Sequence, residues 1–290
     1  MKILLLGNFE EVQNHEHMIK KWFEKLGHSV NTSLEGSTIE HYDLGVIIRG
    51  EHQKPSESLR NACSKLVLWN FEPPGQPYLQ TEDLDKYDVI FNSSKENNDW
   101  VKLRTKTKCV WLTQAIDPEI FRPIEVPKEI DVLFIGTCTA VRFNWINQLY
   151  EQTGQKLRIS IAGRGWGQKV EPVYLDALNN IINRSRVCID LPPWSSPNYT
   201  MTDLNGLHYS QKNMMILAAG GQLLMPYNPD FEGLFKKGYK IWKYVDLEHM
   251  ITLVKEILKK EELNDLWEEV HEKYTYETIL KRMIEVVENG

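Results

Sequence analysis

Short apolar runs, each followed by polar or turn-forming residues, recur along the whole chain and predict buried β-strands. Continuous apolar runs of this kind are typical of parallel sheets, whose strands are covered on both faces. In the first part of the chain they cover residues 2–6, 44–48, 66–69, 89–91 and 110–112. In the second part they cover residues 131–135, 157–162, 187–191, 222–225 and 240–244.

Segments with apolar residues at helical spacing lie between these runs. In the first of them, 17–26, Met18, Trp22 and Phe23 share one face, and Gly27 ends the helix. A strand at the N-terminus, then glycine, then a helix is the opening of a doubly wound α/β domain. Further helices are predicted at 142–151, 174–183, 210–219, 247–258, 263–273 and 276–287.

A Pro-rich segment at 117–127 separates the two sets of strands and predicts a link between domains. We therefore expect an N-terminal Rossmann-like domain at 1–124 and a C-terminal one at 125–275, with parallel sheets and a cleft between them. The last segment, 276–290, forms a helix that can cross back to the first domain.

Composition narrows the class of protein. The chain has 290 residues and a net charge of −6, which argues against a broad nucleic-acid surface and leaves a local basic strip open. The four cysteines lie far apart and indicate buried thiols in a reducing compartment, without a metal cluster. No apolar stretch approaches the length of a membrane span. We expect a cytoplasmic protein, and its oligomeric state stays open.

The stretch 186–226 combines a strand, a long polar loop and a helix start in an order that suits an anion. Ser210 can cap the helix that follows the loop, and Gly220 ends that helix. A helix start presents free N–H groups and the positive end of the dipole, and Lys212 adds a full charge. A phosphate site is one interpretation, and an ordinary βαβ unit is the other. The candidate residues are Tyr209, Ser210, Gln211, Lys212 and Asn213.

Glycine turns follow other strands at the expected crevice. Gly7 and Asn8 follow the first strand, while Gly136 with Thr137, and Gly163, follow the first two strands of the second domain. Glycine there lets the backbone approach a ligand closely, and a tight turn is the simpler reading. Arg142 follows the turn at Gly136, and Arg164 follows Gly163. Each arginine can bind a phosphate or form a surface ion pair.

Two histidines, His15 and His17, lie close to the first of these turns. Their spacing can suggest a metal site, but no third ligand is evident in the sequence. A solvated helix start is the better interpretation.

Several stretches together resemble GT-B glycosyltransferases of the spore-maturation-protein-like branch (glycosyl transferases group 1). VWLTQAIDPEIFRP at 110–123 is similar to the end of their first domain, and DVLFIGTCTAVR at 131–142 to the start of their second. ISIAGRGWG at 159–167 and KNMMILAAGGQLLMP at 212–226 resemble their glycine–tryptophan segment and their Arg-x-Phe-Glu-x-Leu-Ala-x-Gly motif. The stretches at 230–250 and 274–287 resemble the segments that come after this motif in the family.

The resemblance implies that the second domain binds a nucleotide-sugar donor, with a UDP-hexose as the expected one, and that the first domain binds an unidentified acceptor. It implies no bound metal and no cofactor, because cationic side chains and a helix start meet the diphosphate charge. Arg142, Arg164 and Lys212 would neutralise the diphosphate, and N–H groups near Gly136 and Asn213 would bind it. Trp166 could stack on a sugar or base, although a core tryptophan is the simpler interpretation.

One position departs from the family pattern. The family's acidic residue, which holds the ribose hydroxyls, is Met215 here, and Leu207, eight residues earlier, is not acidic either. A thioether is a poor partner for two hydroxyls. Either Gln211 or Asn213 replaces the acid, or the donor site is altered.

Candidate catalytic residues follow strands of the first domain, because a carboxylate or imidazole at a strand end can activate an acceptor. They are Glu72, the first choice, with Glu51 and His52. Besides a glycosyltransferase, three other classes remain: a non-catalytic nucleotide-sugar binding protein, a nucleotide-sugar epimerase, and a DNA-base glycosyltransferase.

Overall fold

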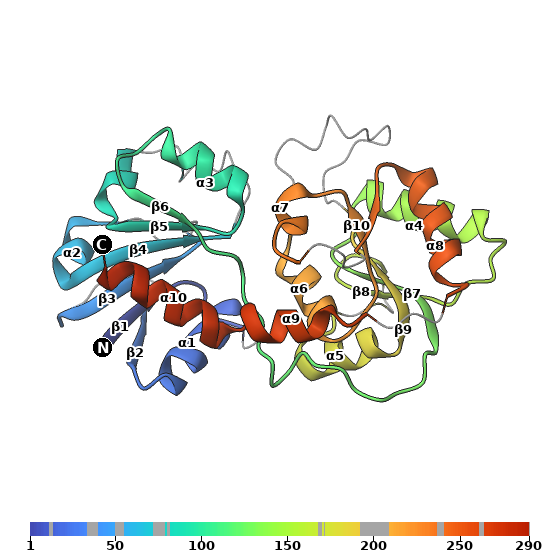
Figure 1. Cartoon of the computed structure of the whole chain (residues 1–290), viewed down its shortest axis with the longest axis horizontal. Coiled ribbons are helices and arrows are strands. Elements are labelled where there is room, and N and C mark those ends of the chain that lie inside the picture. Colours follow the sequence, from blue (N-terminus) through green and yellow to red (C-terminus); the bar gives the residue numbers. More distant parts are fainter. Residues whose placement is uncertain are drawn as a thin grey trace. The chain divides into compact units, whose positions relative to one another are not determined.

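The chain folds into two compact units in a computed structural model (Figure 1). The first comprises Met1–Ala115 with Lys273–Gly290, and the second comprises Ile116–Glu272. The structure describes residues 1–11, 14–33, 40–49, 55–71, 79, 82–167, 170, 172–191, 209–236, 241–260 and 264–289. In those ranges no helix is long and apolar enough to cross a membrane.

The first unit contains a sheet that is six-stranded in the part of the chain the structure describes, with strand order β2-β1-β3-β4-β5-β6. All neighbouring pairs are parallel, which confirms the sequence-based expectation. The strands are β1 (Lys2–Leu6), β2 (Ser29–Ser33), β3 (Tyr42–Ile48), β4 (Cys63–Asn70), β5 (Val89–Asn92) and β6 (Lys108–Trp111). Because β2 lies on one side of β1 and β3 on the other, the strand order reverses between β1 and β3, where α/β sheets bind ligands.

The helices of the first unit include one from the far end of the chain. They are α1 (His15–Lys25), α2 (Glu57–Ala62), α3 (Lys95–Lys102) and α10 (Tyr276–Glu288), with a 3-10 turn at Glu82–Lys86. Helix α10 packs beside α1 (Figure 1). The C-terminal helix therefore completes the domain that the N-terminus begins.

Four elements of this unit were not predicted from the pattern, namely β2, α2, α3 and the 3-10 turn, and β2 and α3 show why. Strand β2 reads SVNTS, and in the described part of the chain its one neighbour is β1. It is an edge strand, and its sequence carries few apolar residues. Helix α3 reads KENNDWVK and buries asparagines along with Val101. Both depend on neighbours that are distant in sequence, and local periodicity therefore missed them.

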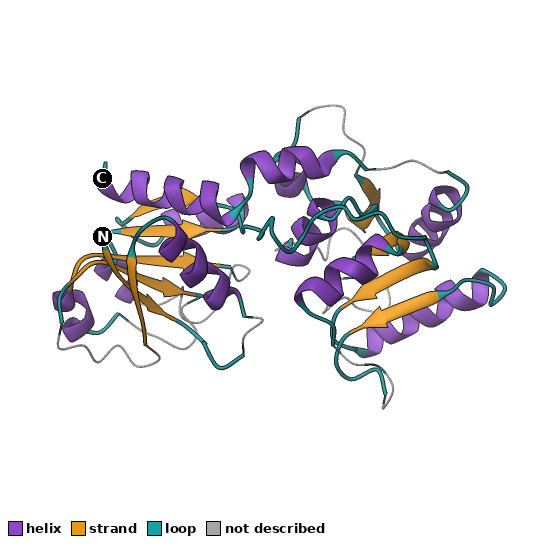
Figure 2. Cartoon of the chain, turned by 90° about the horizontal axis from the view of Figure 1, so that it is seen from below, coloured by secondary structure: helices purple, strands orange, loops and turns teal. Residues whose placement is uncertain are grey.

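The second unit has a parallel sheet of order β11-β10-β9-β7-β8 among the described residues. Its strands are β7 (Ile130–Ile135), β8 (Ile159–Ala162), β9 (Ser185–Ile189), β10 (Leu223–Pro226) and β11 (Trp242–Tyr244). Its helices are α4 (Ala140–Gln152), α5 (Leu175–Asn183), α6 (Gln211–Ala218), α7 (Pro229–Glu232), α8 (Leu247–Ile257) and α9 (Leu266–Lys273) (Figure 2). Here the order reverses between β7 and β9.

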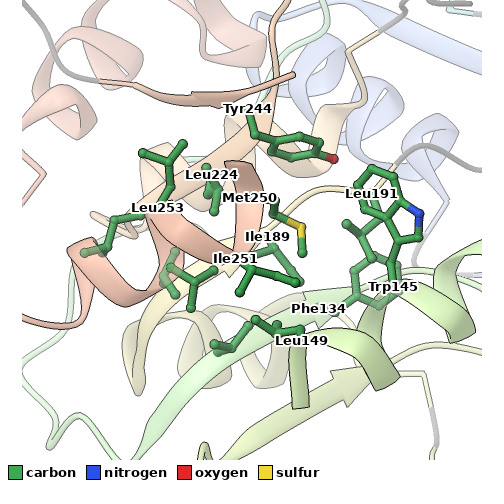
Figure 3. Packing of buried hydrophobic residues seen from close by; sticks show 14 of the residues in the cluster. Phe134, Trp145, Leu149, Ile189, Leu191, Leu224, Tyr244, Met250, Ile251 and Leu253 are labelled. Carbon is green, nitrogen blue, oxygen red and sulfur yellow. The ribbon is translucent and has the colours of Figure 1, made fainter. Parts of the chain in front are cut away.

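The core of the second unit lies between this sheet and helices α4 and α8. Trp145 and Leu149 from α4 pack with Ile251 from α8 and with Ile189 from β9 (Figure 3). Helices α5 and α6 contact each other as well as strands β9 and β10. The sheet is thus held rigidly by packed side chains, and its strand ends are fixed in position.

Candidate functional site

The predicted anion site lies where the strand order of the second unit reverses. Strand β7 ends at Ile135 and β9 at Ile189, and the next helix in the described chain is α4, from Ala140, after β7 and α6, from Gln211, after β9. Thr139 caps α4, because its side chain accepts a hydrogen bond from the N–H of Arg142. The sequence-predicted residues of this unit are therefore grouped at one sheet edge.

Two predicted glycines at this edge approach each other. A Cβ atom on Gly163 would lie 2.0 Å from the carbonyl oxygen of Gly136, a distance that no side chain tolerates. Gly136 has φ +151 and Gly165 has φ +81, which L side chains rarely adopt. The loops also exchange a hydrogen bond from the N–H of Cys138 to the carbonyl oxygen of Arg164, at 2.8 Å. Mutual packing of the two loops is therefore sufficient to explain these glycines.

Arg142 is buried, and its guanidinium binds backbone carbonyl groups. Nε and Nη2 donate to the carbonyl oxygen of Leu191 at 3.0 and 2.7 Å, and Nη1 donates to that of Thr137 at 2.9 Å. These bonds join the loop after β7 to Leu191, two residues after the end of β9. Arg142 orders the site in this structure, and its predicted contact with a diphosphate stays a prediction.

Lys212 is placed at the centre of the site. Its ammonium forms an ion pair with Asp190 at 2.7 Å and donates to the carbonyl oxygen of Ile135 at 3.2 Å. A lysine has three N–H donors. In the described part of the chain the third has no protein partner, and the side chain remains 17% exposed. Lys212 can therefore bind one further anionic oxygen.

The carboxylate of Asp190 lies beside the positive charges of Lys212 and Arg142. Burial acts to raise the pKa of Asp190, but the charge and hydrogen bond of Lys212, the amide of Asn213 and the charge of Arg142 outweigh burial and lower it. Asn213 donates to Asp190 at 2.9 Å and accepts from the hydroxyl of Ser210 at 3.0 Å. The side chain of Asn213 is thus engaged inside the protein, where the sequence had suggested contact with the ribose.

The other predicted residues of this unit differ in exposure. Tyr209 and Gln211 are buried, and the ring of Tyr209 packs against Phe231 with centroids 4.9 Å apart. Trp166 is half-buried, donates from Nε1 to the carbonyl oxygen of Gly136 at 2.8 Å and packs edge-on against Phe134. Arg164 is exposed, near the hydroxyl of Tyr174. Stacking of Trp166 on a ligand stays a prediction.

Met215 lies one turn after Lys212 on α6. In this helix these two residues are half-buried, while the other six are buried. Residues three apart share a helix face. The position of the family's acidic residue is therefore on the side of α6 that also presents Lys212.

The first unit has a second polar cluster where its strand order reverses. Asn8 shapes the loop after β1, because Oδ1 accepts from the N–H of Glu10 and its carbonyl oxygen accepts from the amide of Asn14. A Cβ on Gly7 would lie 2.7 Å from Cγ of Glu16, so that glycine makes room for the carboxylate. The structure thus explains Gly7 and Asn8 by local packing.

Glu16 was not identified from the sequence, and neither was its neighbour Arg49. The interpretation of this helix start as solvated is wrong for Glu16, which is 2% exposed. Arg49 follows β3, and its Nε lies 4.0 Å from Oε1 of Glu16. Burial, followed by the charge of Arg49, lowers the pKa of His15 to about 3. One sequence feature could have revealed this cluster. Three consecutive polar residues, His15 to His17, come soon after the first strand and the glycine that ends it.

The predicted catalytic residues Glu51, His52 and Glu72 lie outside the described residues. Among the described residues, no group of three or more His, Cys, Asp or Glu side chains is placed to hold a metal ion.

Comparison with protein families identifies the second half of the chain. Residues 142–285, which include Arg142, Arg164 and helix α6, match the family described as glycosyl transferase-like. This segment is similar to that family. No curated protein matches the chain. The matched segment contains Lys212 and Asp190, so that the match covers the ion pair at the strand ends.

Solved structures show that the whole chain has the GT-B fold. AviGT4, a glycosyltransferase involved in avilamycin A biosynthesis, has a TM-score of 0.67 at 11% identity, covering 99% of this chain and 97% of that one. Sucrose-phosphate synthase from Thermosynechococcus elongatus has a TM-score of 0.63 at 9% identity, covering 99% and 98%. Anabaena HepE in complex with UDP and glucose has 0.62 at 9% identity, covering 99% of both chains. The expected fold class, two α/β domains with parallel sheets, is confirmed.

Proposed function

We propose that this protein transfers a sugar, a hexose, from a UDP-sugar to a separate acceptor, without a bound metal ion. The observation that carries the proposal is Lys212, which lies in the matched segment and at the strand-order reversal of the second unit, with one N–H donor left for a ligand. The start of α6 adds backbone N–H groups and a dipole end next to that ammonium. Together they suit one phosphate group of a diphosphate.

The choice of nucleotide has separate support. The similar structure of Anabaena HepE contains UDP and glucose. A leaving diphosphate develops negative charge as the sugar bond breaks, and a fixed ammonium stabilises it without rearrangement. In this protein Asp190 and the carbonyl oxygen of Ile135 hold the Lys212 ammonium in place before any ligand arrives.

We place the reaction in the cytoplasm. The four cysteines of the chain are free thiols. Burial raises the pKa of Cys63 to about 11 and that of Cys188 to about 12, which keeps both protonated and unreactive. Free, unreactive thiols are common in proteins of reducing compartments.

The test is calorimetric titration of the full chain with UDP in the presence of EDTA. We expect binding, and we expect the variant Lys212→Met to bind at least about tenfold more weakly, the scale of losing a hydrogen bond to a charged group. Lys243→Met is the matched control, because Lys243 forms an exposed ion pair with Glu232. Binding that vanishes in EDTA and returns with Mg²⁺ or Mn²⁺ would contradict metal independence.

A non-catalytic nucleotide-sugar binder is the second candidate, and Met215 favours it. A thioether on the same side of α6 as Lys212 offers ribose hydroxyls little. Release of UDP from UDP-glucose, with and without candidate acceptors, separates the two functions. Tight UDP binding with no turnover of any UDP-hexose would favour the binder.

A further inference from the structure

Glu16 and Arg49 form a buried charged pair in which each partner keeps an unused hydrogen-bonding atom. Oε1 of Glu16 lies 4.0 Å from Nε of Arg49, which is too long for a hydrogen bond. Within the described residues, neither Oε2 of Glu16 nor Nε of Arg49 has a hydrogen-bond partner. A buried carboxylate with an unused oxygen destabilises the fold. The protein therefore maintains an unsatisfied acceptor beside an unsatisfied donor.

The surrounding backbone holds this pair in place. Gly7 at the end of β1 leaves the space that Cγ of Glu16 fills. Arg49 at the end of β3 has φ 70, a conformation that non-glycine residues rarely adopt, and its N–H donates to the carbonyl oxygen of Trp69 at 2.9 Å. The pair thus lies where the strand order of the first unit reverses. The side chain of Arg49 is 31% exposed, whereas that of Glu16 is 2% exposed.

The two unused atoms specify the chemistry of what can bind. The carboxylate oxygen needs a hydrogen-bond donor, and the guanidinium N–H needs an acceptor. A hydroxyl group offers both, and two adjacent hydroxyls can serve the two residues separately. A phosphate would be attracted by Arg49 and repelled by Glu16, and an ammonium the reverse, so that the pair favours neither charge. We propose that Glu16 and Arg49 bind adjacent hydroxyl groups of a neutral carbohydrate or polyol, which is the acceptor of the transferase.

The neighbouring rings agree with a neutral occupant. The His15 ring lies 5.8 Å from that of Phe71, edge to face. Because the pKa of His15 is about 3, its imidazole carries no charge at neutral pH. The cluster of Glu16, Arg49 and His15 therefore has one negative charge, one positive charge and no net charge.

The acceptor role rests on the proposed function, whereas the binding chemistry does not. The test is saturation-transfer NMR on the full chain with neutral sugars and polyols, namely glucose, galactose, mannose and inositol. Glucose 6-phosphate and glucosamine keep the ring of glucose, and each replaces one hydroxyl group by a charged group. We expect a neutral probe to bind, and both charged analogues to bind more weakly than glucose does.

Three variants assign the binding to this pair. Glu16→Gln and Arg49→Asn should each weaken binding of the neutral probe at least about tenfold, the scale of losing a hydrogen bond to a charged group. Asn is chosen because it tolerates positive φ. Glu24→Gln is the matched control on α1, since Glu24 is exposed and pairs only loosely with Lys20, at 3.6 Å; it should bind as wild type does.

Thermal melting separates a binding role from a structural one. Glu16→Gln keeps the size of the side chain and removes its charge, so that its melting temperature reports the structural contribution of the carboxylate. A lower melting temperature with unchanged sugar binding would overturn the proposal, as would preference for a charged probe or failure of every neutral probe to bind.

Titration of the wild type and the three variants with UDP tests the proposed function separately from sugar binding by Glu16 and Arg49. If UDP binds none of them, the proposed function fails and the sugar result stands alone. If UDP binds all of them while Glu16→Gln leaves sugar binding unchanged, only the inference about Glu16 and Arg49 fails.

Discussion

Lys212 and Asp190 form an ion pair with 2.7 Å between Nζ and Oδ1, which joins the start of α6 to the end of β9. The side chains are 17% and 13% exposed. The pair gives the candidate donor site a fixed cation, and it also contributes to stability. The two contributions can be measured separately.

Lys212→Met should lower the free energy of unfolding by about 1–3 kcal/mol, because Asp190 then remains partly buried without its cation. The double variant Lys212→Met with Asp190→Asn should recover part of the loss, and urea unfolding measures both. Lys243→Met, from an exposed ion pair, should cost less than about 1 kcal/mol. Equal losses in the two single lysine variants would show that burial of the Lys212 pair contributes nothing.

Gly163→Ala should destabilise the second unit by roughly 1–3 kcal/mol or more, the cost of overpacking. The added Cβ would lie 2.0 Å from the carbonyl oxygen of Gly136, so that the two loops must separate. Gly233→Ala is the control, because its nearest neighbour would be 3.4 Å away and its φ is −68. Thermal unfolding of both variants tests this, and a stable Gly163→Ala would contradict the close packing of the loops.

His15 should make the protein less stable in acid. Its pKa is about 3 in the folded chain, against an ordinary value of 6.5. The unfolded chain therefore binds a proton that the folded chain rejects, so that stability is fully present above pH 6.5 and falls toward pH 3. The slope from this group is at most about 1.4 kcal/mol per pH unit. His15→Gln should flatten urea-derived stability across this range, and parallel curves would contradict the low pKa.

Met215→Glu should strengthen UDP binding. Met215 is half-buried on the side of α6 that presents Lys212, and a carboxylate there can accept two ribose hydroxyl hydrogen bonds. Each net hydrogen bond contributes about 1 kcal/mol, so we expect roughly a fivefold gain or more in calorimetry. Weaker binding would indicate a pocket rebuilt around an apolar side chain, and unchanged binding would show that this side of α6 does not contact the nucleotide.

Asn213→Ala should lower stability by about 1–2 kcal/mol, the cost of losing a buried hydrogen-bond partner. Its amide links Asp190 to Ser210 inside the protein. From the sequence alone this variant tests ribose binding, whereas the structure makes it first a test of stability. An unaltered unfolding curve with weakened UDP binding would instead support direct contact between Asn213 and the ribose.

The sequence by itself determined the architecture. Apolar runs predicted nearly all the buried strands, since a strand covered on both faces has to be apolar throughout. The exception was the polar edge strand β2. Glycines after strands marked the sheet edges where loops approach closely, and the order of motifs indicated the GT-B fold.

Only the tertiary structure decided what the polar residues of the sites do. Local sequence does not reveal that Arg142 binds carbonyl oxygens, that Lys212 is paired with Asp190, or that Glu16 is buried beside Arg49. The physical reason is that a charge is satisfied by partners from distant strands and helices, which only the folded sheet brings together. Periodicity reports which face of an element is buried, whereas burial of a charged side chain at a strand end depends on the strand beside it.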